Sequence, residues 1–256
     1  MPGWKRKRAS NMISPDSHDR GSGNDRCEEQ RPSQACPVHL ARRHATQALL
    51  VATALAAIPA FAKPSSPEIL GLPGPRKSGG TSLRDALAGR RSTREFSPRP
   101  LSTQVLSDLL WAANGVNRLG DGKTAPCWRH FDVIEIQVAM ADGVWLYDPR
   151  RHALVQRLRD DARGATGIQD FVAAAPLDLV YVANGERMTG VPADERRLYA
   201  SVDTGFIGQN VYLFCAAEGL ACVFRGAIDY AKLATTLQLD AGQFVTFAQT
   251  VGYPKG

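Results

Sequence analysis

The chain has 256 residues, of which 44% are hydrophobic, and 31 basic and 25 acidic side chains give it a net charge of +6. This composition excludes a disordered or collagen-like protein, and 7% aromatic residues without a basic stripe argue against nucleic-acid binding. Residues 1–62 contain nine Lys or Arg and five Asp or Glu, a net of +4, whereas residues 63–256 contain 22 and 20, a net of +2. The basic character therefore belongs mainly to the front of the chain.

The first 62 residues are expected to address the protein rather than to fold with it. Residues 1–37 have no apolar periodicity, which predicts a disordered extension, or an untranslated one if translation starts near Val38. Residues 38–62 combine Arg42 and Arg43 with a short apolar run and an A-x-A sequence, as in a signal peptide. The apolar run is about half of the ~20 residues that a membrane-spanning helix requires. We therefore expect export, by the general or the twin-arginine route, to the periplasm without stable membrane insertion.

Cysteine and histidine usage limits the chemistry of residues 63–256. Cys127, Cys215 and Cys222 are an odd number of thiols with no C-x-x-C motif, so no disulfide framework is expected. His130 and His152 are the two histidines of this part, which argues against a histidine-rich metal site.

The remaining sequence predicts an extended arm followed by one domain. Residues 63–80 contain four Pro and four Gly, which predicts the arm, and residues 81–256 alternate between two periodicities. Helical spacing and capping residues predict helices at 82–89, 102–115, 195–218 and 229–237. Alternating or continuous apolar runs predict strands at 134–138, 144–147, 177–183 and 243–252. Because the elements do not follow a regular βαβ order, we expect an α+β fold with a largely antiparallel sheet.

A dense basic loop is the most distinctive chemical feature. The sequence lacks G-x-S-x-G, P-loop, G-x-G-x-x-G and H-E-x-x-H motifs, which removes support for triad hydrolases, P-loop enzymes, Rossmann proteins and zincins. Residues 90–94, RRSTR, place three guanidinium groups and two hydroxyls together, and such groups bind a phosphate by charge-assisted hydrogen bonds. A solvated charge cluster is an equally good interpretation of the loop taken by itself.

Six segments in a fixed order extend this observation. They are RRSTREF, LSTQVLSDLLWAANGVNR, KTAPCWRHFDVIEIQVAMADGVWLYD, APLDLVYVAN, DTGFIGQNVYLFCAAEGLACVFRGAID and VGYPKG. Together they resemble the nitroreductase family of FMN-dependent oxidoreductases, with the greatest similarity to the branch that contains the SagB-type peptide azoline dehydrogenases. The resemblance covers residues 69–256. It implies a nitroreductase-like fold in which a mainly antiparallel sheet is flanked by helices around a long central helix, with an FMN domain at residues 81–256.

The resemblance also implies a set of FMN-binding residues. The basic loop matches the family's phosphate and ribityl site, the A-P-C segment matches the site at the pyrimidine edge of the flavin, and Gly226 matches the backbone N–H beside flavin N5. The implied residues are Arg90, Arg91, Ser92, Arg94, Pro126, Cys127, His130, Arg225, Gly226 and Lys255. No side chain is implied as a certain catalytic group, and no metal is expected.

Two residues depart from the family pattern A-P-S-x-x-N. Cys127 stands in place of Ser and His130 in place of Asn. An Asn amide both donates and accepts on one planar group, whereas neutral His has one donor and one acceptor on separate nitrogens. Contact of His130 with the flavin is therefore an open question, and Trp128 beside it is a candidate for stacking on flavin or substrate.

The resemblance implies a homodimer that transfers hydride through flavin N5 to an electron-poor small molecule, such as a nitroaromatic or a quinone. NADH or NADPH is the usual donor in the family, yet an exported enzyme is not expected to meet either one. Two alternatives are a peptide-modifying azoline dehydrogenase and a non-catalytic flavin-binding protein.

Overall fold

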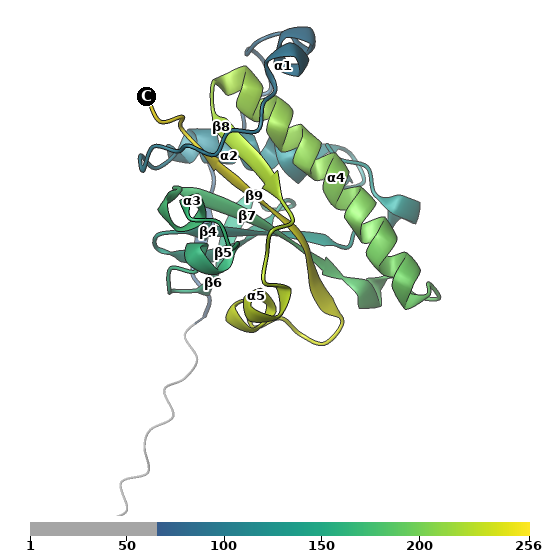
Figure 1. Cartoon of the computed structure of the whole chain (residues 1–256). Coiled ribbons are helices and arrows are strands. Elements are labelled where there is room, and N and C mark those ends of the chain that lie inside the picture. The colour runs from purple at the N-terminus through teal and green to yellow at the C-terminus, as the bar shows by residue number, and fades with distance from the viewer. Residues whose placement is uncertain (1–65) are drawn as a thin grey trace, which may run out of the picture. The chain divides into compact units, whose positions relative to one another are not determined.

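The computed structural model describes residues 66–256, so the predicted extension at 1–37 and the signal peptide at 38–62 lie outside the described residues. Its centre is a seven-stranded, wholly antiparallel sheet in the order β1-β6-β5-β4-β7-β9-β8 (Figure 1). The strands are β1 Ile69–Gly71, β4 Ile134–Met140, β5 Gly143–Asp148, β6 Ala153–Leu158, β7 Leu177–Asn184, β8 Ala221–Arg225 and β9 Gln243–Gly252. A separate hairpin joins β2 Val116–Arg118 to β3 Gly122–Lys123.

Strand β7, which lies between β4 and β9, shows why its sequence is apolar at nearly every position. Leu179 and Tyr181 are buried in the core on one face of the sheet, and Val180 and Val182 in the core on the other. A strand covered on both faces has no solvent side, so its apolar residues do not alternate with polar ones.

The predicted hairpin also forms, since Met140 of β4 pairs with Gly143 of β5.

Several helix ends coincide with predicted capping residues, whereas the longest helix begins at Ala193, two residues before its predicted start. The Ser82 and Ser102 side chains accept hydrogen bonds from the N–H groups of Asp85 and Val105, and Gly219 ends the longest helix at φ +68°. The α-helices are α1 Leu83–Gly89, α2 Thr103–Asn114, α3 Phe171–Ala174, α4 Ala193–Glu218 and α5 Tyr230–Thr236. Three 3₁₀ turns occur at η1 Trp128–His130, η2 Arg163–Ala165 and η3 Gly185–Arg187.

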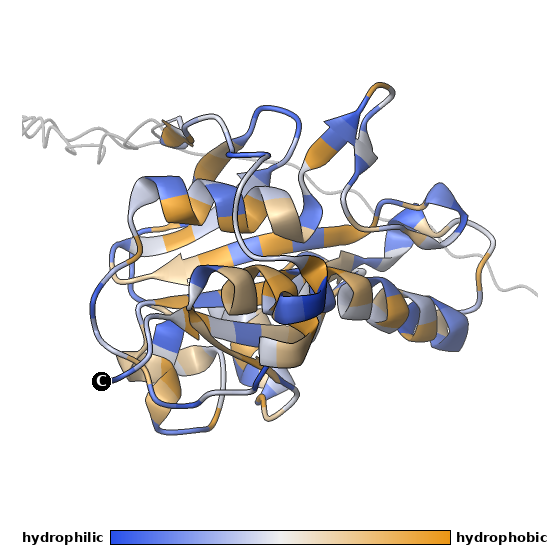
Figure 2. Ribbon diagram, turned by 90° about the horizontal axis from the view of Figure 1, so that it is seen from above, coloured by the Kyte–Doolittle hydropathy of each residue, from blue (hydrophilic) through white to orange (hydrophobic). Residues whose placement is uncertain are grey.

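The helices divide between the two faces of the sheet. Helices α2 and α4 share one core with the inward residues of β4 and β7, whereas α5 packs with the η2 segment on the other face. Figure 2 shows orange residues along the central strands, and helices that carry both orange and blue residues. The predicted α+β fold with a long helix is thus confirmed, and no helix between residues 66 and 256 is long and apolar enough to cross a membrane.

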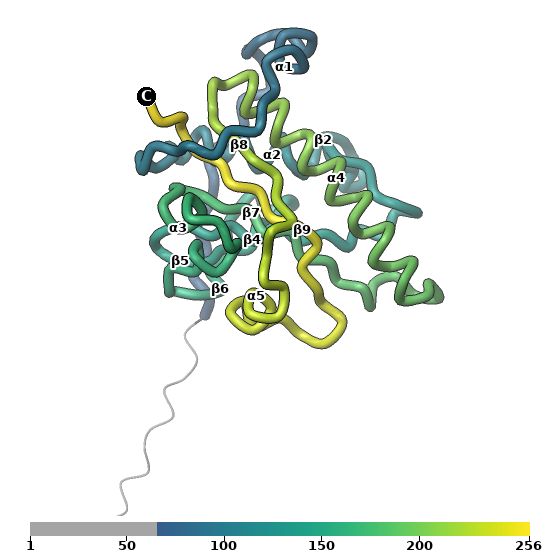
Figure 3. The backbone as a smooth tube through the Cα atoms, viewed as in Figure 1, coloured from purple at the N-terminus to yellow at the C-terminus, as the bar shows by residue number. Residues whose placement is uncertain are grey.

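The two ends of the described chain add contacts that the sequence pattern did not predict. The predicted arm contains β1, which pairs with the edge of β6, and Arg76 in the arm forms an ion pair of 2.6 Å with Asp108 of α2. At the other end, the Lys255 N–H donates to the Glu95 carbonyl at 3.3 Å. Figure 3 shows the C-terminal segment running beside the segment that follows α1. The C-terminal segment therefore lies against the residues that follow the basic loop, Glu95 to Ser97.

Candidate active site

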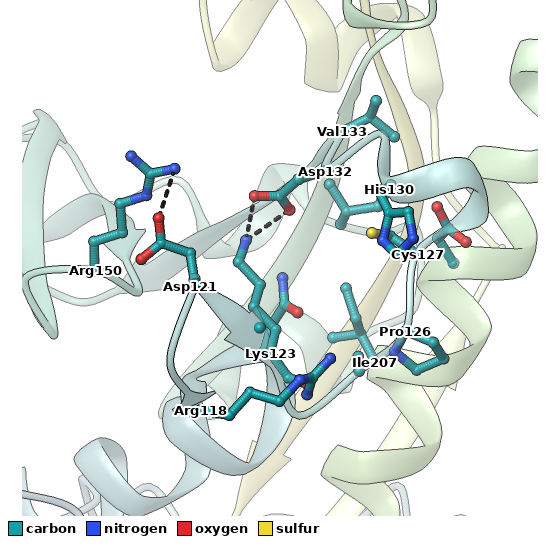
Figure 4. A pocket seen from close by; sticks show the side chains of 16 residues that line it. Arg118, Asp121, Lys123, Pro126, Cys127, His130, Asp132, Val133, Arg150 and Ile207 are labelled. Atoms are coloured by element: carbon teal, nitrogen blue, oxygen red, sulfur yellow. Dashed lines mark hydrogen bonds and ion pairs between the residues drawn. The ribbon is translucent and has the colours of Figure 1, made fainter.

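A cavity of about 350 Å³ lies between the β2–β3 hairpin, the segment leading into β4 and the middle of α4 (Figure 4). Three of the predicted site residues line it, namely Pro126, Cys127 and His130. The other ionisable groups that line it are Arg118, Asp121, Lys123, Asp132, Arg150 and Asp203. The cavity is therefore polar and mixed in charge, as expected of a site for a small polar or aromatic molecule.

A strained turn forms the wall of the cavity that carries Cys127 and His130. Arg129 and His130 adopt left-handed backbone conformations with φ of +47° and +61°. Such residues cost about 1–2 kcal/mol each outside glycine, so neighbouring contacts must stabilise the turn. The Trp128 ring stacks on Tyr199 of α4, with 3.7 Å between the ring centres. The backbone N–H of Trp128 donates to both carboxyl oxygens of Asp203 at 3.0 and 3.2 Å. Helix α4 thus holds the turn in place.

Stacking on Tyr199 also answers the question raised for Trp128. The ring stacks on Tyr199, and the guanidinium of Arg129 is 4.6 Å from the ring centre. Two neighbours of the same chain therefore already contact the indole. Its role in this structure is to anchor the turn.

Asp203 is the least exposed acid of the cavity, with 2% of its surface accessible. Burial raises the pKa of its carboxyl to about 6; the Trp128 N–H opposes the rise and the charge of Asp132 adds to it. Burial, followed by Asp132 and Asp203, also raises the pKa of the Cys127 thiol. Cys127 is therefore a neutral thiol near pH 7 and not a thiolate nucleophile.

Two ion pairs lie along the same cavity. Lys123 contacts both carboxyl oxygens of Asp132 at 2.6 Å, and its side chain is largely buried. Arg150 lies 3.1 Å from Asp121, and both of these side chains are exposed (Figure 4). Exposed pairs contribute about 1 kcal/mol or less. The Arg150 pair can therefore open for a ligand at small cost.

The predicted phosphate loop lies elsewhere, against the second half of α4. The Ser92 hydroxyl is 2.8 Å from the Tyr212 hydroxyl, which accepts a hydrogen bond from the Phe224 N–H of β8, also at 2.8 Å. The Thr93 N–H donates to the Cys222 carbonyl at 2.9 Å. Tyr212 and β8 therefore fix the loop on a strand that ends next to Gly226.

The arginines of the loop fit a phosphate group. Arg90 lies over the Tyr212 ring at 5.2 Å, and Arg91 and Arg94 are exposed. Within residues 66–256 none of the three forms an ion pair. The backbone of Lys255 contacts Glu95, the residue that follows the loop. The Arg91 guanidinium also donates to the Ala88 and Arg90 carbonyls at 2.9 and 3.3 Å. Guanidinium groups without ion pairs are the kind of donor that a phosphate dianion requires.

The structure differs from the expectation for the side chain of Arg225. This residue is 3% exposed, and its guanidinium lies 2.7 Å from Asp178 and donates to the Thr166 carbonyl and the Thr250 hydroxyl, each at 2.9 Å. Burial raises the pKa of Asp178 to about 6 against the opposing effect of Arg225. The Arg225 side chain is therefore held inside the protein by its own hydrogen bonds. Of the two neighbours Arg225 and Gly226, the exposed Gly226 is the one whose backbone can contact a cofactor.

The predicted site residues thus form two groups. The basic loop, Lys255 and Gly226 gather around β8, and Pro126, Cys127 and His130 line the cavity beside Asp203. Tyr212 lines a second hollow of about 180 Å³ with Arg91 and Thr93, and the cavity and this hollow share no lining residue. Asp203 and Tyr212 are nine residues apart on α4, about 13 Å along the axis at 1.5 Å per residue. Neither residue is among the predicted site residues, although both lie in the helix predicted at 195–218.

Among the described residues, no cluster of three or more His, Cys, Asp or Glu side chains could hold a metal ion.

Comparison with known proteins agrees with this geometry. The family model described as "Nitroreductase family" matches residues 87–253. A protein of Methanocaldococcus jannaschii named as a nitroreductase is 37% identical over 155 residues, which are 57% of this chain and 78% of that protein. A nitroreductase from Ralstonia eutropha JMP134, known from its crystal structure, is 41% identical in sequence to this chain and superposes with a TM-score of 0.71. The match covers 76% of this chain and 93% of that one.

A more distant structure shows the same fold. It is the NADPH:FMN oxidoreductase from Vibrio harveyi complexed with NAD⁺, 20% identical with a TM-score of 0.51, covering 68% of this chain and 69% of that one. The chain described here belongs to the nitroreductase family. It is accordingly a flavin-dependent oxidoreductase.

Proposed function

We propose that the protein uses FMN to transfer hydride from a reduced donor, through flavin N5, to an electron-poor small molecule of the nitroaromatic or quinone type. The observation that carries this proposal is the group of loop arginines without ion pairs in residues 66–256, fixed to β8 by Thr93 and Tyr212. Bound FMN would supply a ring that accepts and returns a hydride. The chain's own residues bind it and control what reaches it.

The residues that would hold FMN have separate tasks. Arg90, Arg94 and Lys255 would neutralise the phosphate, and Ser92 would bind the ribityl chain or the phosphate with its hydroxyl. The Tyr212 hydroxyl already accepts from Phe224, so it can donate to Ser92 and leave the Ser92 proton for the ligand. The backbone N–H of Gly226, four residues after Cys222, would face the ring.

A second copy of the chain would complete the site. The cavity beside Asp203 and the hollow beside Tyr212 share no lining residue in one chain. Helix α4 also exposes the apolar side chains of Leu198, Val202 and Phe206, with 58%, 44% and 45% of their surface accessible. These residues follow each other at four-residue spacing and form a stripe on one face of the helix. We propose that this stripe packs against a partner subunit in a homodimer.

The donor and the location of the protein are linked proposals. NADPH appears in the name of the Vibrio harveyi protein, and a nicotinamide donor is our first choice for this chain. The signal peptide proposed at residues 38–62 would carry the enzyme to the periplasm, where another reductant would be needed. A donor screen with NADH, NADPH and reduced quinols decides between the two.

The double variant Arg90→Ala and Arg94→Ala tests the cofactor site. It removes two of the charged partners of the phosphate, so the purified protein is expected to lose its FMN while it stays folded. Arg99→Ala is a matched control, since Arg99 lies over the Tyr253 ring outside the loop. Unchanged flavin content in the double variant would refute the placement of the phosphate.

A further inference from the structure

Asp203 is a buried acid with no cation to balance it in the described part of the chain. Its carboxyl oxygens accept the Trp128 N–H at 3.0 and 3.2 Å, and no ion pair joins it to a Lys, Arg or His of residues 66–256. Buried carboxylates are normally paired, because desolvation of an unpaired charge is costly. An unpaired acid on the wall of a cavity is therefore a candidate for proton transfer.

The other charged groups of the cavity leave Asp203 uncompensated. Lys123 is occupied by both oxygens of Asp132, and the negative charge of Asp132 acts on Asp203 in the same direction as burial. Arg118 and Arg150 are exposed and pair with Asn117 and Asp121 rather than with Asp203. The remaining titratable groups on the same cavity are Cys127 and His130 of the strained turn.

Asp203 is also placed to act on a ligand and not only on the fold. It lines the cavity together with Pro126, Cys127 and Ile207, which give the neighbouring wall a partly apolar character. One Trp128 N–H is shared by its two oxygens, so either oxygen retains lone-pair positions for a second partner. A protonated carboxyl at this position can donate its hydrogen to an oxygen atom of a bound molecule.

We propose that Asp203 is a catalytic acid that protonates the electron acceptor bound in the cavity between the β2–β3 hairpin, the Trp128 turn and α4. The inference rests on the proposed function, which supplies the hydride. A quinone becomes a hydroquinone when it gains one hydride, which brings both electrons, and one proton. The Asp203 O–H bond breaks and its proton forms the second new bond, on an acceptor oxygen. The carboxylate left behind then takes up a hydronium proton from the solvent that enters the cavity.

Asp203→Asn tests the assignment, because the amide oxygen can still accept the Trp128 N–H and keep the turn in place. Purified holoenzyme is reduced without oxygen, and its reoxidation by benzoquinone is followed by stopped-flow absorbance from pH 5 to 8. In the wild type the rate is expected to fall tenfold per pH unit above the pKa of Asp203. In Asp203→Asn the rate of reoxidation is expected to be independent of pH. At pH 5 it is expected to be about 10²–10⁴-fold slower than in the wild type, which is the usual contribution of a positioned acid.

Two further measurements separate catalysis from structure. The Trp128 amide ¹⁵N resonance reports directly on the Asp203 charge, so it should titrate near pH 6 in the wild type and not in Asp203→Asn. Asp203→Glu, which restores a carboxyl group, should recover part of the pH dependence, and Asp142→Asn in the β4–β5 turn should behave as the wild type.

The outcomes distinguish this proposal from the proposed function. A yellow protein that is reduced by the donor, but whose Asp203→Asn variant is reoxidised at the wild-type rate with the wild-type pH profile, overturns the role of Asp203 alone. A Trp128 amide that does not titrate between pH 5 and 8 overturns it as well. A protein that binds no FMN overturns both proposals.

Discussion

Replacing Asp203 by Asn is expected to stabilise the folded protein at pH 8 and to leave its stability at pH 4 nearly unchanged. The pKa of this carboxyl rises from 3.8 to about 6 on folding, mainly through burial. Between these two values the folded state binds more protons than the unfolded state, so the free energy of unfolding of the wild type falls as the pH rises from about 4 to 6. Asn does not titrate and escapes this loss.

The size of the effect follows from the pKa shift. A shift of about two units corresponds to about 3 kcal/mol at ~1.36 kcal/mol per unit, which is an upper bound for the gain at pH 8. For a domain of this size, each kcal/mol shifts the melting temperature by about 2–4 °C, so the variant should melt up to about 6–12 °C higher at pH 8.

Urea unfolding and thermal melts at pH 4 and pH 8, followed by circular dichroism, measure the difference. Asp142→Asn is the matched control, since this acid is exposed and should change stability by less than about 0.5 kcal/mol at either pH. An Asp203→Asn variant that is equally or more destabilised at pH 8 than at pH 4 would show that the carboxyl is not strained by burial.

Three further predictions concern other parts of the molecule. Arg225→Met leaves Asp178 buried without its cation and should cost about 3–5 kcal/mol in the free energy of unfolding by urea, whereas Arg159→Met in an exposed pair should cost less than about 1 kcal/mol. Phe206→Glu places a charge on the apolar stripe of α4 and should convert the proposed dimer to monomers in sedimentation velocity; a wild type that is already monomeric would contradict the proposed interface. His130→Asn should shift the flavin midpoint potential in a spectroelectrochemical titration if His130 contacts the ring, and an unchanged potential would show that it does not.

The sequence predicted elements with a strong local signal and missed those that depend on distant partners. Helix α2 could be predicted because Ser102 caps it and Gly115 ends it, and β7 because its apolar run is continuous. Strand β6 was not predicted, since it lies between β5 and the short β1 near the sheet edge and carries mixed residues. Its pairing with the arm is a long-range property that no local pattern contains.

The candidate site likewise combines features with a local sequence signal and features that depend on residues far apart in the chain. The basic loop and the A-P-C segment are visible in the sequence, and the A-P-C segment lines the cavity. Their binding of FMN stays a prediction. Asp203 was missed because its burial depends on the Trp128 turn, 75 residues earlier in the chain. The role of Arg225 was also set by a distant residue, Asp178, which takes its guanidinium into the interior.

The most direct test of FMN-dependent oxidoreduction is an absorbance spectrum of the purified protein before and after anaerobic addition of NADPH. A yellow protein that bleaches with NADPH and recovers its colour with a quinone or a nitroaromatic compound is the predicted result. Yellow protein that no donor reduces would indicate flavin binding without catalysis. Protein that stays colourless after FMN is added and the excess removed would contradict the proposed function.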